Sequence, residues 1–332
     1  MSSSVTNRSP AAAVRRIRDG SRNVRVKLGA RFRLILASMW KYRLSYLFVM
    51  PFLLLFFIFI LIPVLFGILL SFTDFNAMEF PRWVGWDNYQ NLLSQDTVFL
   101  QHVLPNTFTF ALFVGPLGYV CAFLLAAAIA QMPRLPRTGF ALAMYAPSLT
   151  TGIAMVVVWQ VMFTGDRTGY INSFLLKWGF IQQPIFFVLD PNWLLPVMIV
   201  VSIWASMGIG FLAILAGILN VDRQLIEAGR IDGIANKLQE LWYITIPSMK
   251  PQLLFAAVMS IVHTLKTGGI GTQLSGTNPT PNYAGQLMIN HIEDYAFIRF
   301  EMGYASAISV VLLLLMYMLS RLFTSLFGSK EG

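Results

Sequence analysis

The sequence predicts an all-α polytopic membrane protein with about six transmembrane helices, and two observations carry this prediction. Of the 332 residues, 56% are apolar and only 12% are charged, and the mean hydropathy is +0.65. Soluble domains carry charge on about a quarter of their residues, so this composition excludes a soluble fold. The second observation is that uncharged stretches long enough to cross a hydrocarbon core of about 30 Å recur along the chain.

The chain opens with a basic segment, residues 1–43, that holds eleven Lys and Arg and a single acid, Asp19. Its Ser- and Ala-rich start predicts a partly disordered tail. The apolar run that follows is too long for the h-region of a signal peptide. We therefore expect a tail followed by a membrane domain over residues 44–327.

Six apolar stretches make up this domain. The first carries no charge, and its internal prolines, Pro51 and Pro63, are tolerated in membrane helices. A Gly/Thr/Asn/Pro-rich connector and a short helix near 284–297 are expected between the last two spans. The predicted spans cover residues 44–73, 104–131, 138–164, 193–221, 251–267 and 302–327.

Lysine and arginine predict the orientation of these spans. Six spans place both termini on one side, and that side carries nineteen Lys and Arg against five on the other. The positive-inside rule therefore places both termini in the cytoplasm. The net charge of +9 is accounted for by orientation and contact with membrane lipid, and no nucleic-acid partner is expected.

Residues 222–251 form a polar passage between two spans that is still patterned as ordered helix. Asp222 is a predicted N-cap, and the first helix, 223–231, should end at a left-handed turn at Gly233. A second helix is predicted to begin at Asn236, with Gln239 in a capping-box-like position. Its predicted apolar face consists of Leu238, Leu241 and Trp242.

This passage resembles the EAA loop of permease subunits of ATP-binding-cassette (ABC) importers, and of the carbohydrate-uptake group above all. Two residues depart from the usual pattern, because Gly229 and Ile234 stand where Ala is usual. The resemblance implies that the partner ATPase grips the loop as it closes on ATP. The coupling residues it implies are Glu227, Ala228, Gly229, Asp232, Gly233 and Pro247, the last within the run Ile244-Thr245-Ile246-Pro247.

The likeness extends over nearly all of residues 40–327, including the SFTDF run after the first span and the closing stretch 297–310. It implies the type I importer permease fold in a bacterial cytoplasmic (inner) membrane. It also implies four kinds of partner: a second permease that is a different chain, two ATP-binding subunits, an extracytoplasmic solute-binding protein and a carbohydrate.

The sequence contains none of the usual motifs of nucleotide, metal or acyl-transfer chemistry. No catalytic residue, metal site or cofactor is therefore expected in this chain, and Mg-ATP is expected on the partner subunits. His102, His263 and His291 lack the spacing of an intramembrane hydrolase or metal site. Cys121, the single cysteine, lies in an apolar run and excludes an internal disulfide.

An ion-coupled secondary transporter is the alternative function class. Such carriers usually need a charged residue at membrane depth, and the predicted spans hold none near their middle. Matched broken helices in two halves would favour that class, and no internal repeat is present. The function of an ATP-driven importer subunit is therefore preferred to that of an ion-coupled transporter.

The predicted substrate path lies on the fifth span, where Ser260, His263, Thr264 and Thr267 share one helical face beside Lys266. Such a polar stripe must face protein or water, so packing against a neighbouring span is the alternative. Further candidates that could stack on or bond to a sugar ring are Trp159, Gln160 and Trp204. Ser202 and Ser206 are interpreted as helix-packing contacts.

The expected substrate is an oligosaccharide, and an acidic one if Lys266 lies beside the path. The resembled family also includes glycerol-phosphate importers, so a non-sugar solute remains the alternative within the importer class.

Overall fold

The computed structural model describes residues 42–149 and 152–327. Most of the predicted tail, 1–43, lies outside these residues. The chain divides into two units at residue 66. The first unit carries most of one apolar helix, built from α2 (Arg43–Phe56), a π-helical turn η1 (Phe57–Leu61) and α3 (Ile62–Leu70).

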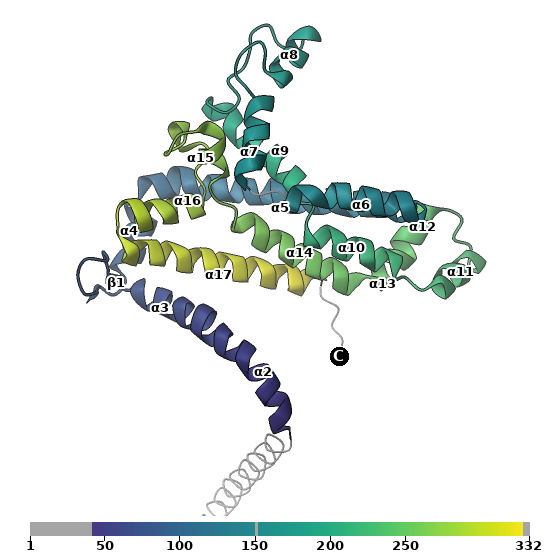
Figure 1. The fold of residues 1–332 in the computed structure, drawn as a ribbon, viewed down its shortest axis with the longest axis horizontal. Coiled ribbons are helices and arrows are strands. Elements are labelled where there is room, and N and C mark those ends of the chain that lie inside the picture. The colour runs from purple at the N-terminus through teal and green to yellow at the C-terminus, as the bar shows by residue number, and fades with distance from the viewer. Residues whose placement is uncertain (1–41, 150–151, 328–332) are drawn as a thin grey trace, which may run out of the picture. The chain divides into compact units, whose positions relative to one another are not determined.

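The second unit is a helical bundle in which α5, α10, α14 and α17 pack on one another (Figure 1). A small residue lets α10 and α14 approach closely: a Cβ on Gly217 of α10 would lie 3.2 Å from Cβ of Gln252 on α14, which is tighter than an ordinary contact. The bounds of the helices are η2 (Phe99–Val103), α5 (Leu104–Ala130), α6 (Arg134–Leu149), α7 (Gly152–Met162), α8 (Tyr170–Lys177), α9 (Pro191–Ala205), α10 (Ile209–Leu219), α14 (Lys250–Leu265) and α17 (Met302–Phe327).

Three helices among the described residues are long and apolar enough to cross a membrane: Arg43–Leu70, Phe99–Ala130 and Met302–Ser325. The number rises to five if each bent pair is counted as one span. One pair is α9 with α10, bent by 44°, and the other joins Lys237–Ser248 to α14, bent by 80°. The predicted third span, 138–164, corresponds to α6 and α7 on either side of residues 150–151.

Among the predicted spans, the first and the second differ in their bounds from the helices observed in a way that the structure explains. The first helix ends at Leu70, because Thr73 pairs in a short strand, and the second begins at Phe99 rather than at residue 104. The connector 268–283 is also more ordered than expected, since it contains the short helix α15 (Ile270–Ser275) and a 3-10 turn η4 (Pro281–Tyr283).

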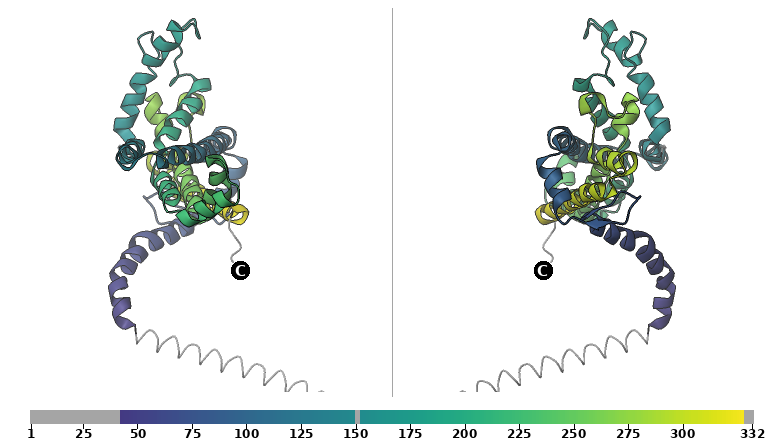
Figure 2. Two further views of the ribbon diagram at one scale, coloured as in Figure 1. Left: turned by 90° about the vertical axis from the view of Figure 1, so that its right-hand side faces the viewer. Right: turned by 90° about the vertical axis from the view of Figure 1, so that its left-hand side faces the viewer.

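Short elements gather at the two ends of the bundle (Figures 1 and 2). One end carries the antiparallel pair β1 (Thr73–Asp74) and β2 (Arg82–Trp83), α4 (Asp87–Ser94), α16 (Met288–Glu293) and η5 (Asp294–Ile298). The opposite end carries α11 (Arg223–Ile231), α12 (Lys237–Glu240), η3 (Leu241–Thr245) and α13 (Ile246–Ser248).

Candidate functional site

The segment between α10 and α14 has the local structure that its sequence predicts. The Asp222 side chain accepts a hydrogen bond from the Gln224 N–H at 2.9 Å and caps α11. Gly233 follows with φ of +100°, a conformation that favours glycine. Asn236 accepts from the Gln239 N–H at 2.8 Å, while Gln239 reaches back to the N–H of residue 235. This segment, residues 222–251, is called the coupling segment below.

Gly229, one of the two departures from the usual loop pattern, is the buried position of α11 and lies next to the other, Ile234. A Cβ at this position would collide with Cδ1 of Ile244 and lie 3.0 Å from Cδ1 of Ile234. An alanine at 229 would therefore crowd Ile244 most and Ile234 less, and the two unusual residues lie against each other.

The coupling segment exposes several apolar side chains, and an ion pair and a hydrogen bond hold its helices to each other and to the bundle. Ile231, Leu238 and Trp242 are 87%, 78% and 68% exposed, and five of the six predicted coupling residues are exposed as well: Glu227, Ala228, Asp232, Gly233 and Pro247. The Nη2 atom of Arg230 lies 3.5 Å from Oε2 of Glu240, and this ion pair joins α11 to α12. Lys237 Nζ donates to Gln131 Oε1 at 3.1 Å, which joins α12 to the end of α5. A rigid element with an exposed apolar face is suited to docking on a partner.

The predicted polar stripe of α14 is turned partly toward α5. Ser260 Oγ donates to the Gly115 carbonyl at 3.2 Å, and Thr264 Oγ1 donates to the Ser260 carbonyl at 2.8 Å. Thr267 Oγ1 donates to the His263 carbonyl at 3.0 Å. Each of these hydroxyls therefore has a hydrogen-bond acceptor within the protein, whereas the His263 side chain is exposed.

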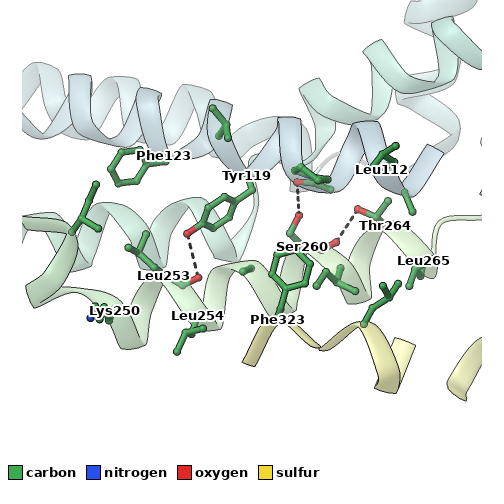
Figure 3. Close-up of a pocket in the computed structure, with 18 of the residues that line it drawn as sticks. Leu112, Tyr119, Phe123, Lys250, Leu253, Leu254, Ser260, Thr264, Leu265 and Phe323 are labelled. Carbon is green, nitrogen blue, oxygen red and sulfur yellow. Dashed lines mark hydrogen bonds between the residues drawn. The ribbon is translucent and has the colours of Figure 1, made fainter. Parts of the chain in front are cut away.

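The larger of two cavities beside this stripe has a volume of about 660 Å³ and lies between α5, α14 and α17 (Figure 3). Its walls are mostly apolar, and the hydroxyls among its lining residues are confined to Tyr119, Ser260 and Thr264. A sugar placed there would leave its own hydroxyls without partners, which is unfavourable. This cavity is therefore a poor site for a carbohydrate.

The smaller cavity, of about 210 Å³, lies at the break between α9 and α10 and has a more polar lining. The first turn of α10 has no side-chain cap, and its N-cap residue, Gly208, also lines the cavity. Backbone N–H groups at such a helix start lack partners within the helix. Polar side chains from three helices and from the turn after α9 also line the cavity, namely Tyr119, Tyr145, Ser148, Ser206, Ser260, His263 and Thr264.

The remaining predicted path residues do not line either cavity. Trp159 meets Trp204 edge to face, with ring centroids 5.4 Å apart. Gln160 Nε2 donates to the Gln273 carbonyl at 2.7 Å, so this side chain holds α15 against α7. Lys266 is exposed at the C-terminal end of α14.

Residues 134–328 match the family described as binding-protein-dependent transport system inner membrane component. This match covers more than half of the chain. The chain belongs to this family. The predicted identity of the chain as a permease of a binding-protein-dependent ABC importer is confirmed, and it is a transport component of the inner membrane.

Relatives and solved structures agree with this family. The probable ABC transporter permease protein YesP of Bacillus subtilis is 32% identical over 275 residues, which cover 82% of this chain and 86% of that protein. The arabinooligosaccharides transport system permease protein AraP of the same organism is 30% identical over 299 residues, covering 86% and 89%. A crystal structure of a bacterial ABC transporter involved in the import of the acidic polysaccharide alginate contains a chain that matches with a TM-score of 0.73. At 23% identity over 90% of this chain and 99% of that chain, the match confirms the predicted fold.

The structure of this importer permease brings together a buried cluster that the sequence did not reveal. Asp96 Oδ2 accepts hydrogen bonds from Tyr304 at 2.9 Å and lies 2.8 Å from His291 Nε2, while Oδ1 accepts from the Phe99 N–H at 2.8 Å. Burial by itself raises the pKa of the Asp96 carboxyl. The hydrogen bonds from His291 and Phe99 outweigh burial and lower the pKa to about 2.

Tyr119, Tyr145 and Ser148 are polar cavity residues of the permease that sequence reasoning missed. Tyr145 and Ser148 lie three positions apart on α6, so a search for polar pairs at helical spacing could have found these two. Within the described residues no group of three or more His, Cys, Asp and Glu could hold a metal ion.

Proposed function

We propose that this chain is the transmembrane subunit that forms part of the translocation path for an oligosaccharide. The polar cavity at the break between α9 and α10 carries the proposal, because it offers hydroxyl, imidazole and backbone groups inside a membrane bundle. Sugar hydroxyls are donors and acceptors at once, and each must be paired in a site that excludes water. The relative AraP, a transporter of arabinooligosaccharides by name, supports a substrate of this class.

The cavity holds only a part of such a substrate. Its volume of about 210 Å³ lies below the roughly 300 Å³ of small ligand pockets. In this proposal the second permease, a different chain, supplies the facing wall. Ser260, His263 and Thr264 contact the sugar in the cavity, and Thr267, Trp159, Gln160 and Trp204 border the path beyond the C-terminal end of α14.

ATP is bound with Mg²⁺ by two separate cytoplasmic subunits in this proposal, and a solute-binding protein delivers the sugar from the other side. The coupling segment is placed in the cytoplasm together with both termini, on the strength of the Lys and Arg distribution. Its exposed carboxylate, Glu227, accepts charge-assisted hydrogen bonds from an ATPase subunit. The turn at Gly233 fixes the angle of α11 to the bundle.

Lys266 is the residue whose charge should influence whether an acidic or a neutral substrate is preferred. Its ammonium group is exposed one turn beyond His263, and it favours an acidic glycan such as a uronate in the path. Lys266→Ala should therefore impair import of an acidic oligosaccharide more than import of a neutral one. A glycerol phosphate would also be attracted by Lys266, and competition by this solute, with none by oligosaccharides, would favour the non-sugar alternative.

Cysteine accessibility in the assembled importer tests the path. In a Cys121→Ala background, cysteines at Ser260, His263 and Thr267 should react with a water-soluble thiol reagent, and substrate should protect the first two. Cysteines at Val258 and Val262, which line neither cavity, serve as controls. Equal reaction of both sets, or reaction of neither, would contradict the proposed path.

A further inference from the structure

A patch of large apolar side chains is exposed between the first and second spans. Met78 and Phe80, in the loop between β1 and β2, are 82% and 94% exposed. Trp83 and Trp86 are 68% and 65% exposed, and Leu93 on α4 is 61% exposed. We call these five residues the aromatic patch.

The aromatic patch is built on a rigid base. The Phe72 ring stacks on Trp83 at 5.5 Å and meets Trp86 edge to face at 5.1 Å. Asn88 Nδ2 donates to the carbonyls of Ser71 and Thr73 at 2.9 and 3.0 Å. Because both tryptophans are held before any partner arrives, little side-chain freedom is lost when the patch is covered.

The ends of three membrane spans fix the depth of the aromatic patch. The first span ends at Leu70, three residues before β1, and the second begins at Phe99, five residues after α4. The Gly303 N–H, next to the first residue of α17, donates to the Phe75 carbonyl at 3.0 Å. A Cβ at Gly303 would collide with the Thr73 carbonyl, so this strand lies directly on the start of the last span.

The chemistry of the patch suits the border between lipid tails and headgroups. Within the described residues neither Trp83 nor Trp86 donates its indole N–H to another group of the protein. Tryptophan at a membrane interface keeps its ring in apolar surroundings and its N–H with polar headgroups. The one charged pair of the loop, Arg82 with Glu79 at 3.1 Å, is neutral overall.

We propose that the aromatic patch is a lipid-binding anchor that lies in the membrane interface on the side opposite the coupling segment. Phe80 and Met78 enter the upper part of the acyl chains, and the two tryptophans lie among the headgroups. Since β1 is bonded to the start of α17, the anchor also sets the depth of the last span. A protein partner of the importer is the competing occupant.

Fluorescence quenching in the complete importer, reconstituted in phosphatidylcholine vesicles, tests this proposal. In a Cys121→Ala background a single cysteine at Phe80 or Trp83 is labelled with an environment-sensitive dye. Asn91 is the matched control, because it is exposed on α4 but lies on the helix face away from Trp86 and Leu93. Quenchers are a lipid spin-labelled near its headgroup and aqueous iodide.

Dyes at Phe80 and Trp83 should be quenched several-fold more by the lipid label than by iodide, and the dye at Asn91 should show the reverse. Strong iodide quenching at Phe80, equal to that at Asn91, would show the patch in water and overturn the proposal. Protection of Phe80 from both quenchers would show a protein partner on the patch and would also overturn it. None of these outcomes depends on whether the transported solute is a sugar.

Discussion

The Nε2 atom of His291 lies 2.8 Å from Oδ2 of Asp96, although 195 positions separate the two residues in the chain. The side chains are only 4% and 6% exposed. Tyr304 at the start of α17 donates to the same carboxylate oxygen. One buried carboxylate thus joins the segment before α5, the helix α16 and the last span.

Removing this acceptor should destabilise the protein. Asp96→Ala leaves the donors at Phe99 and Tyr304, and the His291 ring, without their partner, and breaking a buried pair of this kind typically costs about 3–5 kcal/mol. Thermal unfolding of the purified protein should show a clearly lower Tm. Glu79→Ala, which breaks an exposed pair, is the control and should change stability by less than about 1 kcal/mol. Equal Tm values for the two variants would contradict a stabilising role for the cluster.

The same carboxylate makes stability depend on acid pH. Its pKa of about 2 in the folded protein lies below the usual value of 3.8, so the folded state binds its proton more weakly than the unfolded state does. The stabilisation is therefore complete well above pH 4 and is lost as the pH falls toward 2. The Tm difference between the wild type and Asp96→Asn should be constant at neutral pH and shrink below about pH 4. A difference that grows with acidification would be inconsistent with a depressed pKa.

Local features of this chain could be predicted from sequence, whereas contacts across the bundle could not. The N-caps at Asp222 and Asn236 and the turn at Gly233 depend on residues within four positions, and each is present. The Asp96 cluster depends on how α16 and α17 meet the second span, and no local pattern contains that information.

The same limit applies to the substrate path. The helical face of Ser260 and His263 was visible in the sequence, and both residues line the polar cavity. The break after Ala205 that opens this cavity contains no proline, but Ser206 and Gly208 lie within it, and such a Gly/Ser pair is an ordinary signal of a bend that the prediction of one continuous span, 193–221, did not use. Gln160 was predicted from its residue type to bind a sugar. In the structure its Nε2 donates a hydrogen bond to the Gln273 carbonyl of α15, a contact that the sequence does not reveal.

The coupling segment should be required for transport and not for insertion. Glu227→Lys reverses the exposed charge on α11, and Gly233→Pro cannot adopt the observed φ of +100° because proline fixes φ near −65°. Both variants should reach the membrane at normal levels yet lose substrate uptake and substrate-stimulated ATP hydrolysis by the assembled importer. Glu227→Gln keeps the shape and should lose less. Full uptake by Glu227→Lys would contradict the coupling role.

The pairing of Gly229 with Ile234 can be tested by a double-mutant cycle. Gly229→Ala alone crowds the ends of Ile234 and Ile244, and overpacking of this kind costs about 1–3 kcal/mol, toward the low end here because both ends are flexible. Ile234→Ala should relieve part of that crowding, so the double variant should be more stable than the sum of the single changes predicts. The expected coupling free energy is about 0.5–1 kcal/mol. Additive changes in Tm would show that the two residues vary independently.

His263 provides the sharpest test of the polar cavity, because its side chain is exposed there and no hydrogen bond ties it to the described part of the chain. His263→Leu should remove one hydrogen bond to the sugar, worth about 0.5–1.5 kcal/mol, and so raise the apparent KM for uptake by up to about tenfold. Assembly with the partner subunits should be unchanged. Val262→Leu, one position away and outside both cavities, adds apolar volume without touching the cavity and should transport like the wild type. If the two variants behave alike, His263 does not contact the substrate, and the polar stripe of α14 serves only to pack against α5.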